Sequence, residues 1–311
     1  MKNNDCLEGE LKALYDKWSA EINADPYMSQ LTQVYEKWLN ELRSAHSYLL
    51  EDKKYSNPYY LYVPNEWATA KNKIMIIGEE GYGNWGCGKK CGWIKNTPAW
   101  TPDSFNDIRL YHRDLILSQT KYRDLLSKRE DGSDLVNTDE YIEFAKWFNS
   151  LYKRKPFNSD FWRRIYAIYS VDKNNGAIIW NNLDKVFSLR GDNDRCALKH
   201  TDRVNLHSVK TKLLEEEIKI TQPTIVIFNG WYGTSIKAEL KHIYDKFYED
   251  APLEEWKENK VCAVTDDTYG GTVKYICAYH PAFRPNTLNG KFGNNKTEYE
   301  KFLIQKIEGL L

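Results

Sequence analysis

The sequence predicts an α/β fold: a mostly parallel four-stranded sheet flanked by helices, with an N-terminal helical extension and a helical insertion. Three observations favour this class. Short apolar runs alternate with stretches of helical periodicity, which is typical of buried parallel strands joined by crossover helices. Three of these runs end in polar or glycine-rich segments, as at the ligand-binding edge of such sheets. The composition, with 41% hydrophobic and 28% charged residues, is that of a globular protein.

The elements follow one another in a simple order. Residues 8–50 carry apolar side chains at helical spacing and are predicted to form two amphipathic helices. We assign residues 1–54 to the helical extension and 55–311 to the α/β domain, with the helical insertion at about 101–170. Four strands and two further helices are predicted in the domain: strands at 74–77, 177–180, 225–228 and 273–278, and helices at 204–219 and 297–310.

The segment 78–92 directly follows the first predicted strand. It holds six glycines in fifteen residues, and so many glycines cost too much backbone entropy for the interior of a helix or strand. We therefore predict a loop here, at the carboxyl end of the strand.

Charge and hydropathy exclude several classes of protein. Forty-four Lys and Arg balance forty-four Asp and Glu, so any contact with nucleic acid must come from a local patch. Apolar runs such as 74–77 are far shorter than the ~18 residues of a membrane span, and the first residues lack the apolar core of a signal peptide. We expect a cytoplasmic monomer that makes no contact with membranes.

The three polar strand ends, taken in order, resemble motifs of the uracil-DNA glycosylase superfamily. Gly78–Tyr82 (GEEGY) is similar to its G-x-D-P-Y or G-E-x-P-G loop, Asn182–Lys185 (NLDK) to its N-x-x-K segment, and His280–Ala282 (HPA) to its H-P-S or H-P-A segment. The resemblance covers roughly residues 55–311. Gly81 stands where the family usually has Pro, and Glu80 where the uracil-specific branch has Asp. The resemblance implies a glycosylase that flips a base out of DNA and hydrolyses its N-glycosidic bond without a cofactor.

That reaction passes through a cationic sugar and an anionic leaving base, so it needs a carboxylate near the sugar and donors near the base. The resemblance implies that Glu80 activates the water and stabilises the cation, with Glu79 as the other candidate. Adjacent residues in an extended segment point to opposite sides, so both cannot face the sugar. The alternative for either Glu is a solvent-exposed side chain or a cap on the following helix.

The resemblance also implies that His280 donates a hydrogen bond to the O2 atom of the leaving pyrimidine, and that Asn182 reads the edge of the flipped base. A neutral imidazole suits this role. Asn181 competes with Asn182, and the N-x-x-K spacing to Lys185, a further expected substrate-binding residue, favours Asn182. The structural alternatives are a His in a polar niche beside Pro281 and an Asn that closes a turn.

Further residues are expected to contact the substrate or the DNA. Tyr82 matches the family's Tyr beside the pyrimidine 5-position, and Gly78 and Gly81 belong to the same loop, whose glycines let the backbone approach a phosphate. Stacking on the base is open to several rings: Tyr82, Trp85, Trp93, Trp100 and Phe105. Four residues are expected to bind DNA: Lys89 and Lys90 by charge, and Phe283 and Arg284 from the family's minor-groove loop.

No metal is expected. The six Cys are scattered, and the spacing of Cys87 and Cys91 does not match the iron–sulfur branch of the superfamily.

The sequence thus predicts a DNA glycosylase for uracil or another modified pyrimidine, a bulky viral base included. Two rivals remain: a superfamily member without catalysis that binds nucleic acid or a partner protein, and an unrelated nucleotide-binding enzyme. The absence of a complete G-x-x-x-x-G-K-[ST] P-loop string disfavours the second rival.

Overall fold

The computed structural model describes residues 25–51, 55, 61, 63, 65–78, 160, 164–165, 167–168, 176–186, 198–230, 233–281, 291–292 and 295–311. Its chain divides into two compact units. The first comprises Met1–Val63, Glu80–Asp114 and Asp184–Thr221, and the second Pro64–Glu79, Leu115–Leu183 and Gln222–Leu311. Each unit therefore uses several separate stretches of the chain, and the predicted division at residue 54 stays a prediction.

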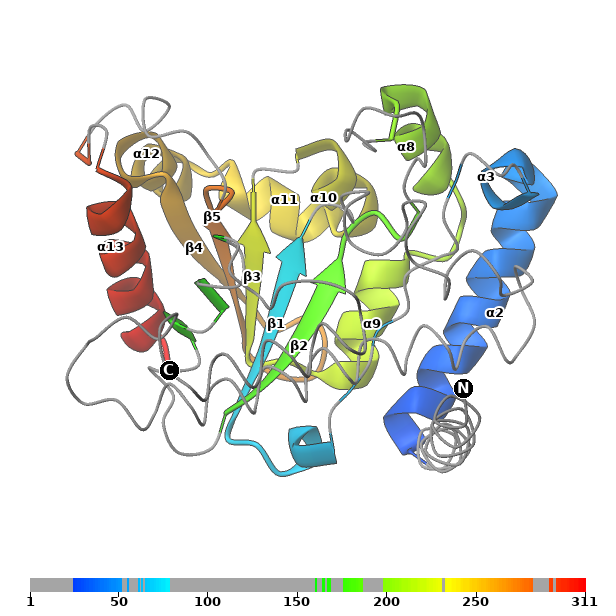
Figure 1. Cartoon of the computed structure of the whole chain (residues 1–311), viewed down its shortest axis with the longest axis horizontal. Helices are drawn as coiled ribbons and strands as arrows, with labels where there is room; N and C mark the ends of the chain where they lie inside the picture. Colours follow the sequence, from blue (N-terminus) through cyan, green and yellow to red (C-terminus); the bar gives the residue numbers. More distant parts are fainter. Residues whose placement is uncertain are drawn as a thin grey trace, which may run out of the picture. The chain divides into compact units, whose positions relative to one another are not determined.

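The second unit is built on a five-stranded sheet with the strand order β2-β1-β3-β5-β4 (Figure 1). Its first four strands in that order are parallel, and β4 runs antiparallel to β5. The sheet confirms the predicted α/β class and adds one strand to the four predicted. The bounds are β1 Asn72–Gly78, β2 Gly176–Asn182, β3 Ile225–Asn229, β4 Val261–Asp266 and β5 Val273–Ala278.

The central strands are apolar because both of their faces are covered. All five residues of β3 are buried, as are the last five of β1, and Ile74 lies between Ile178 of β2 and Ile225 of β3 in the register. Strands buried on both faces show continuous apolar runs, which is why the sequence reveals them. The edge strand β4 has a partly exposed, partly polar pattern, and the sequence does not reveal it.

Helices accompany the sheet in the second unit: η1 Asn65–Ala68, α10 Gly233–Glu239, α11 Lys241–Phe247, α12 Asp250–Asn259 and α13 Lys296–Glu308. Of these, α11 and α12 contact β4. The helix α13 confirms the predicted C-terminal helix. It begins at the N-cap Asn295, whose side chain accepts a hydrogen bond from the Glu298 N–H.

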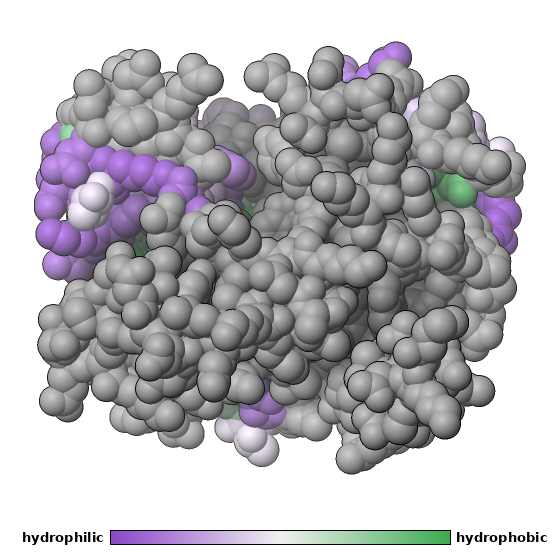
Figure 2. All heavy atoms as spheres, in the orientation of Figure 1, coloured by the Kyte–Doolittle hydropathy of each residue, from purple (hydrophilic) through white to green (hydrophobic). Residues whose placement is uncertain are grey.

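The helix α13 is amphipathic. Tyr299, Leu303 and Ile307, spaced by four residues, are buried, whereas Glu298 and Lys301 are exposed. Figure 2 shows hydrophilic side chains gathered on the side of the second unit where α13 lies. Its apolar face thus packs on the unit and its polar face meets solvent.

The described part of the first unit is helical. It contains α2 Pro26–His46, α3 Tyr48–Glu51, α8 His200–Leu206 and α9 Leu213–Thr221, and α2 contacts the other three. Asp25 caps α2 by accepting a hydrogen bond from the Met28 N–H, and Pro26 occupies a first-turn position that needs no N–H donor. This helix confirms the second of the two predicted N-terminal helices; most of the first lies outside the described residues.

The prediction of one helix over residues 204–219 is wrong, because α8 and α9 are separate helices. The chain between them is held in a turn by the Lys212 side chain, whose ammonium donates to the carbonyl oxygens of His207 and Val209 at 2.8 and 3.1 Å. Helical periodicity continues across the break, so the pattern does not show it. Within the described residues, the helices lack the combined length and apolar character needed to cross a membrane.

Candidate active site at the carboxyl edge of the sheet

Four parallel strands of the second unit end at one edge of the sheet. Gly78, at the end of β1, pairs with Asn182 of β2, and Asn229 of β3 pairs with Ala278 of β5. The Leu183 N–H donates to the Gly78 carbonyl at 2.8 Å and extends the pairing beyond β2. Ligands of open α/β sheets bind at this edge. The structure therefore brings Gly78, Asn182 and the segment that leads to His280 to one edge, as the sequence predicts.

The two neighbouring asparagines at the end of β2 differ in their contacts. Asn181 is buried, with its Oδ1 accepting from the Asn182 N–H at 2.8 Å and its Nδ2 lying 3.7 Å from the Met75 Sδ. The Asn182 side chain points to the other face of the strand. It is 2% exposed, and its Nδ2 has no hydrogen-bond partner. A buried amide donor without a partner costs about 1–3 kcal/mol, so this one calls for an explanation.

His280 follows β5 and is half-buried. Burial, with smaller contributions from the positive charges of Arg164 and Lys296, lowers the pKa of its imidazole to about 4, against an opposing effect of Asp160. A depressed pKa means that the ring is neutral at pH 7. A neutral imidazole carries one N–H and can donate a hydrogen bond without bringing a positive charge.

Arg164 contacts residues at this edge and is not among the predicted site residues. Its side chain is wholly buried, and its Nη1 donates to Asn229 Oδ1 at 2.9 Å and to the Tyr279 carbonyl at 2.6 Å. Its Nε and Nη2 donate to the two carboxylate oxygens of Glu300 at 2.9 and 2.6 Å. The signal in the sequence is weak: an arginine beside Ile165 within an apolar stretch.

The backbone of Tyr279 is held from the other side by α13. Its N–H donates to the Tyr299 hydroxyl at 2.6 Å, and that hydroxyl donates to the Lys260 carbonyl at 2.9 Å. Burial raises the pKa of Tyr299, so the hydroxyl keeps its proton. The Tyr279 ring also stacks on Trp256, with a centroid distance of 6.1 Å. The residue before His280 is thus fixed at its backbone and its ring.

Lys185, predicted to bind substrate, is engaged inside the first unit. Its Nζ lies 2.7 and 2.9 Å from the two carboxylate oxygens of Glu217, and both side chains are buried. The Tyr35 hydroxyl donates to the same carboxylate at 2.5 Å and accepts from the Leu61 N–H at 3.0 Å. Direct contact between Lys185 and a base would require this ion pair to break.

The remaining predicted site residues lie outside the described residues: Glu79, Glu80, Gly81, Tyr82, Lys89, Lys90, Phe283 and Arg284. Their predicted roles stay predictions.

Two described cysteines face each other across the β4–β5 pair. Cys262 and Cys277 are free thiols, fully buried, and burial raises the pKa of Cys262 to about 12 and that of Cys277 as well. Protonated, buried thiols are poor nucleophiles and poor metal ligands. In the described part of the chain, no three His, Cys, Asp or Glu side chains gather as metal ligands would.

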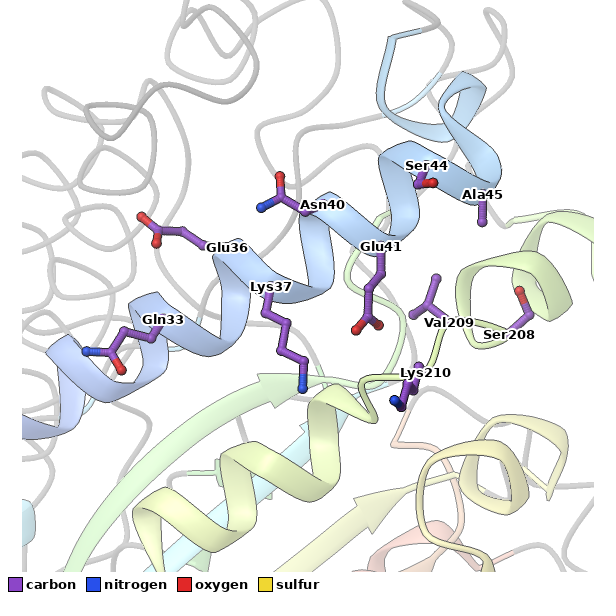
Figure 3. A pocket seen from close by; sticks show the side chains of 10 residues that line it. All are labelled: Gln33, Glu36, Lys37, Asn40, Glu41, Ser44, Ala45, Ser208, Val209 and Lys210. Atoms are coloured by element: carbon purple, nitrogen blue, oxygen red, sulfur yellow. The ribbon is translucent and has the colours of Figure 1, made fainter.

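The first unit carries a separate surface groove of about 840 Å³ between α2 and residues 208–210 (Figure 3). Glu41 lies in it and accepts from the Thr211 N–H and hydroxyl at 2.7 and 2.9 Å. Burial by itself would raise the pKa of Glu41, but the Thr211 hydrogen bonds and the charges of Lys37 and Lys210 lower it overall. The groove therefore holds charges of both signs and resembles an ordinary polar surface.

Comparison with protein-family models and curated sequences finds no relative of this chain. No protein-family model matches the chain, and no curated protein sequence is significantly similar to it.

Proposed function

We propose that this protein is a DNA glycosylase that hydrolyses the N-glycosidic bond of uracil or another modified pyrimidine flipped out of DNA. The observation that carries the proposal is the buried Nδ2 of Asn182, which has no hydrogen-bond partner and lies on the same sheet edge that leads to the neutral imidazole of His280. The motif resemblance assigns these two residues to the two ends of a bound pyrimidine.

The Asn182 amide suits the recognition of a base. It offers a donor and an acceptor side by side, which matches the paired acceptor and donor on the edge of a pyrimidine. Its Nδ2 has no partner in the free protein, so a bound base would remove the cost of an unpaired buried donor. A solvent-exposed Asn would have to give up water to bind and would gain less.

His280 suits the stabilisation of the leaving base. As the bond between C1′ and the base nitrogen breaks, the electron pair moves onto the base, and negative charge grows on its carbonyl oxygens. A preorganised donor acts most strongly on charge that develops in the transition state. With a pKa of about 4 the imidazole donates a hydrogen bond and keeps its proton, and the departing base takes its proton later from solvent.

The sheet sets the spacing between these groups. Two strands, β1 and β3, separate β2 from β5. Neighbouring strands are about 4.8 Å apart, so the backbones of β2 and β5 are about 14 Å apart. That width accommodates one pyrimidine ring between an amide and an imidazole side chain. The attacking water would bond to C1′ and give up a proton to a carboxylate, a role that we assign to Glu80, or to Glu79 in its place.

The test is base release from defined oligonucleotides. Duplexes and single strands that each carry one modified pyrimidine, from uracil to bulky glycosylated bases, are incubated with the protein, and abasic sites are then cleaved by alkali. We expect strand breaks that depend on one class of base and become about a hundredfold slower in His280→Ala. His242→Ala, a histidine on α11 outside the site, serves as the matched control and should cleave as fast as the parent.

Two outcomes would contradict the proposal. Binding of DNA without breaks at any base would favour the non-catalytic rival, and equal cleavage by the parent and His280→Ala would make the match of the third motif accidental.

A further inference from the structure

Both backbone polar groups of Tyr279 are bonded to buried side chains from other elements. The N–H donates to Tyr299, and the carbonyl accepts from Arg164 at 2.6 Å. This carbonyl belongs to the peptide that joins Tyr279 to His280. The orientation of that peptide determines where the His280 side chain begins.

Contacts other than the one to that peptide also hold the Arg164 side chain in place. Its Nε and Nη2 form a two-pronged pair with Glu300 of α13, and its Nη1 also reaches Asn229 at the end of β3. A planar guanidinium can serve these acceptors together because its five N–H groups point in fixed directions. An ammonium group on a flexible stem cannot reproduce this geometry.

We propose that Arg164 is a positioning residue that holds the peptide between Tyr279 and His280, so that the imidazole stands where it can donate to a leaving base. The inference deepens the proposed function and rests on it for the nature of the reaction. Arg164 bonds the carbonyl of the residue before His280, so we assign it an action through His280.

The electrostatic surroundings of His280 allow position and charge to be separated. Arg164 and Lys296 lower the pKa of the imidazole together with burial, and Asp160 opposes them. Glu300 pairs with Arg164, and Asp160 pairs with Lys296 at 2.6 Å. Lys296 thus supplies charge near the imidazole, whereas Arg164 supplies charge and also the hydrogen bond to the peptide.

Two variants exploit this difference. Arg164→Lys keeps the positive charge and loses the planar guanidinium with its several hydrogen bonds. It should therefore slow single-turnover base release by about ten- to a hundredfold while the pKa of His280 changes little. Lys296→Met removes a positive charge and keeps the Arg164 hydrogen bonds. It should therefore raise the pKa of His280 and leave base release at pH 7 within about twofold of the parent. The pKa is measured by NMR titration of the imidazole ring, with the signal assigned through His280→Gln.

Hydrogen exchange of the His280 amide, the N–H of the peptide whose carbonyl Arg164 holds, gives a readout that needs no substrate. We expect faster exchange in Arg164→Lys than in the parent, and parental exchange in Lys296→Met. If the parent releases no base from any oligonucleotide, the proposed function fails, and this exchange experiment still decides the positioning role.

Parental base release or parental amide exchange in Arg164→Lys would overturn the inference. Equal loss of base release in both variants would also overturn it, because charge would then explain the effect. If Arg164→Lys does not fold, Glu300→Gln weakens the hydrogen bonds that hold Arg164 in place, and the same measurements apply.

Discussion

Variants of the buried ion pair between Lys185 and Glu217 can distinguish a structural role for Lys185 from its predicted role in substrate binding. Replacing Lys185 by Met keeps a long apolar stem and removes the ammonium group. The Glu217 carboxylate then stays buried, with the Tyr35 hydroxyl as its remaining donor among the contacts described above. If the ion pair is structural, Lys185→Met should lower the free energy of unfolding. If Lys185 contacts the substrate, the same change should slow base release.

The magnitude follows from the burial of both partners. Their side chains are 3% and 0% exposed, so removal of one partner leaves an uncompensated buried charge and should cost about 3–5 kcal/mol. Glu217→Gln should cost a similar amount because it removes the carboxylate charge beside a buried ammonium. In the double variant the amide oxygen of Gln still accepts from Tyr35, and no buried charge remains. We expect the double variant to lose about 1–2 kcal/mol, less than either single variant.

Urea unfolding followed by tryptophan fluorescence measures these free energies. Lys219→Met is the matched control, because the Lys219 ammonium pairs with Glu215 on the surface of α9 and the Lys219 side chain is 41% exposed. That change should cost less than about 0.5 kcal/mol. The reasoning is refuted if Lys185→Met costs less than about 1 kcal/mol, or if the double variant loses the sum of the two single effects. Loss of base release with full stability would restore Lys185 to the substrate site.

Three further predictions concern the carboxyl edge. As pH falls from 6.5 to 4, the unfolded chain protonates His280 before the folded protein does, so urea unfolding should show the parent losing on the order of 3 kcal/mol relative to His280→Gln. Because the Asn182 Nδ2 makes no hydrogen bond, Asn182→Leu should leave the stability unchanged or higher while slowing base release about a hundredfold; a stability loss above about 2 kcal/mol would contradict this. In single-turnover assays Glu80→Gln should abolish turnover and keep DNA binding; if Glu79→Gln is the inactive variant, the assumed register of that loop is wrong.

The sequence alone gives a good account of the central sheet. Residues 74–77 and 225–228 form continuous apolar runs because β1 and β3 are covered on both faces, and such runs have few alternatives to a parallel strand. Strand alternation separates Asn181 from Asn182 without any coordinates. In the structure the Asn181 side chain contacts Met75, whereas the Asn182 Nδ2 has no partner; the role of Asn182 in reading a base stays a prediction.

Only the tertiary structure reveals the contacts that join distant parts of the chain. Arg164 bonds Tyr279 and Glu300, which are 115 and 136 residues away, and Lys185 pairs with Glu217 across 32 residues. Local periodicity carries no information about such pairs, because it reports which face of an element is buried and not what the buried charge meets. The lowered pKa of His280 has the same origin: burial and nearby charges come from separate segments. The order of residues therefore predicted the edge of the sheet, and long-range packing decided which side chains are available there.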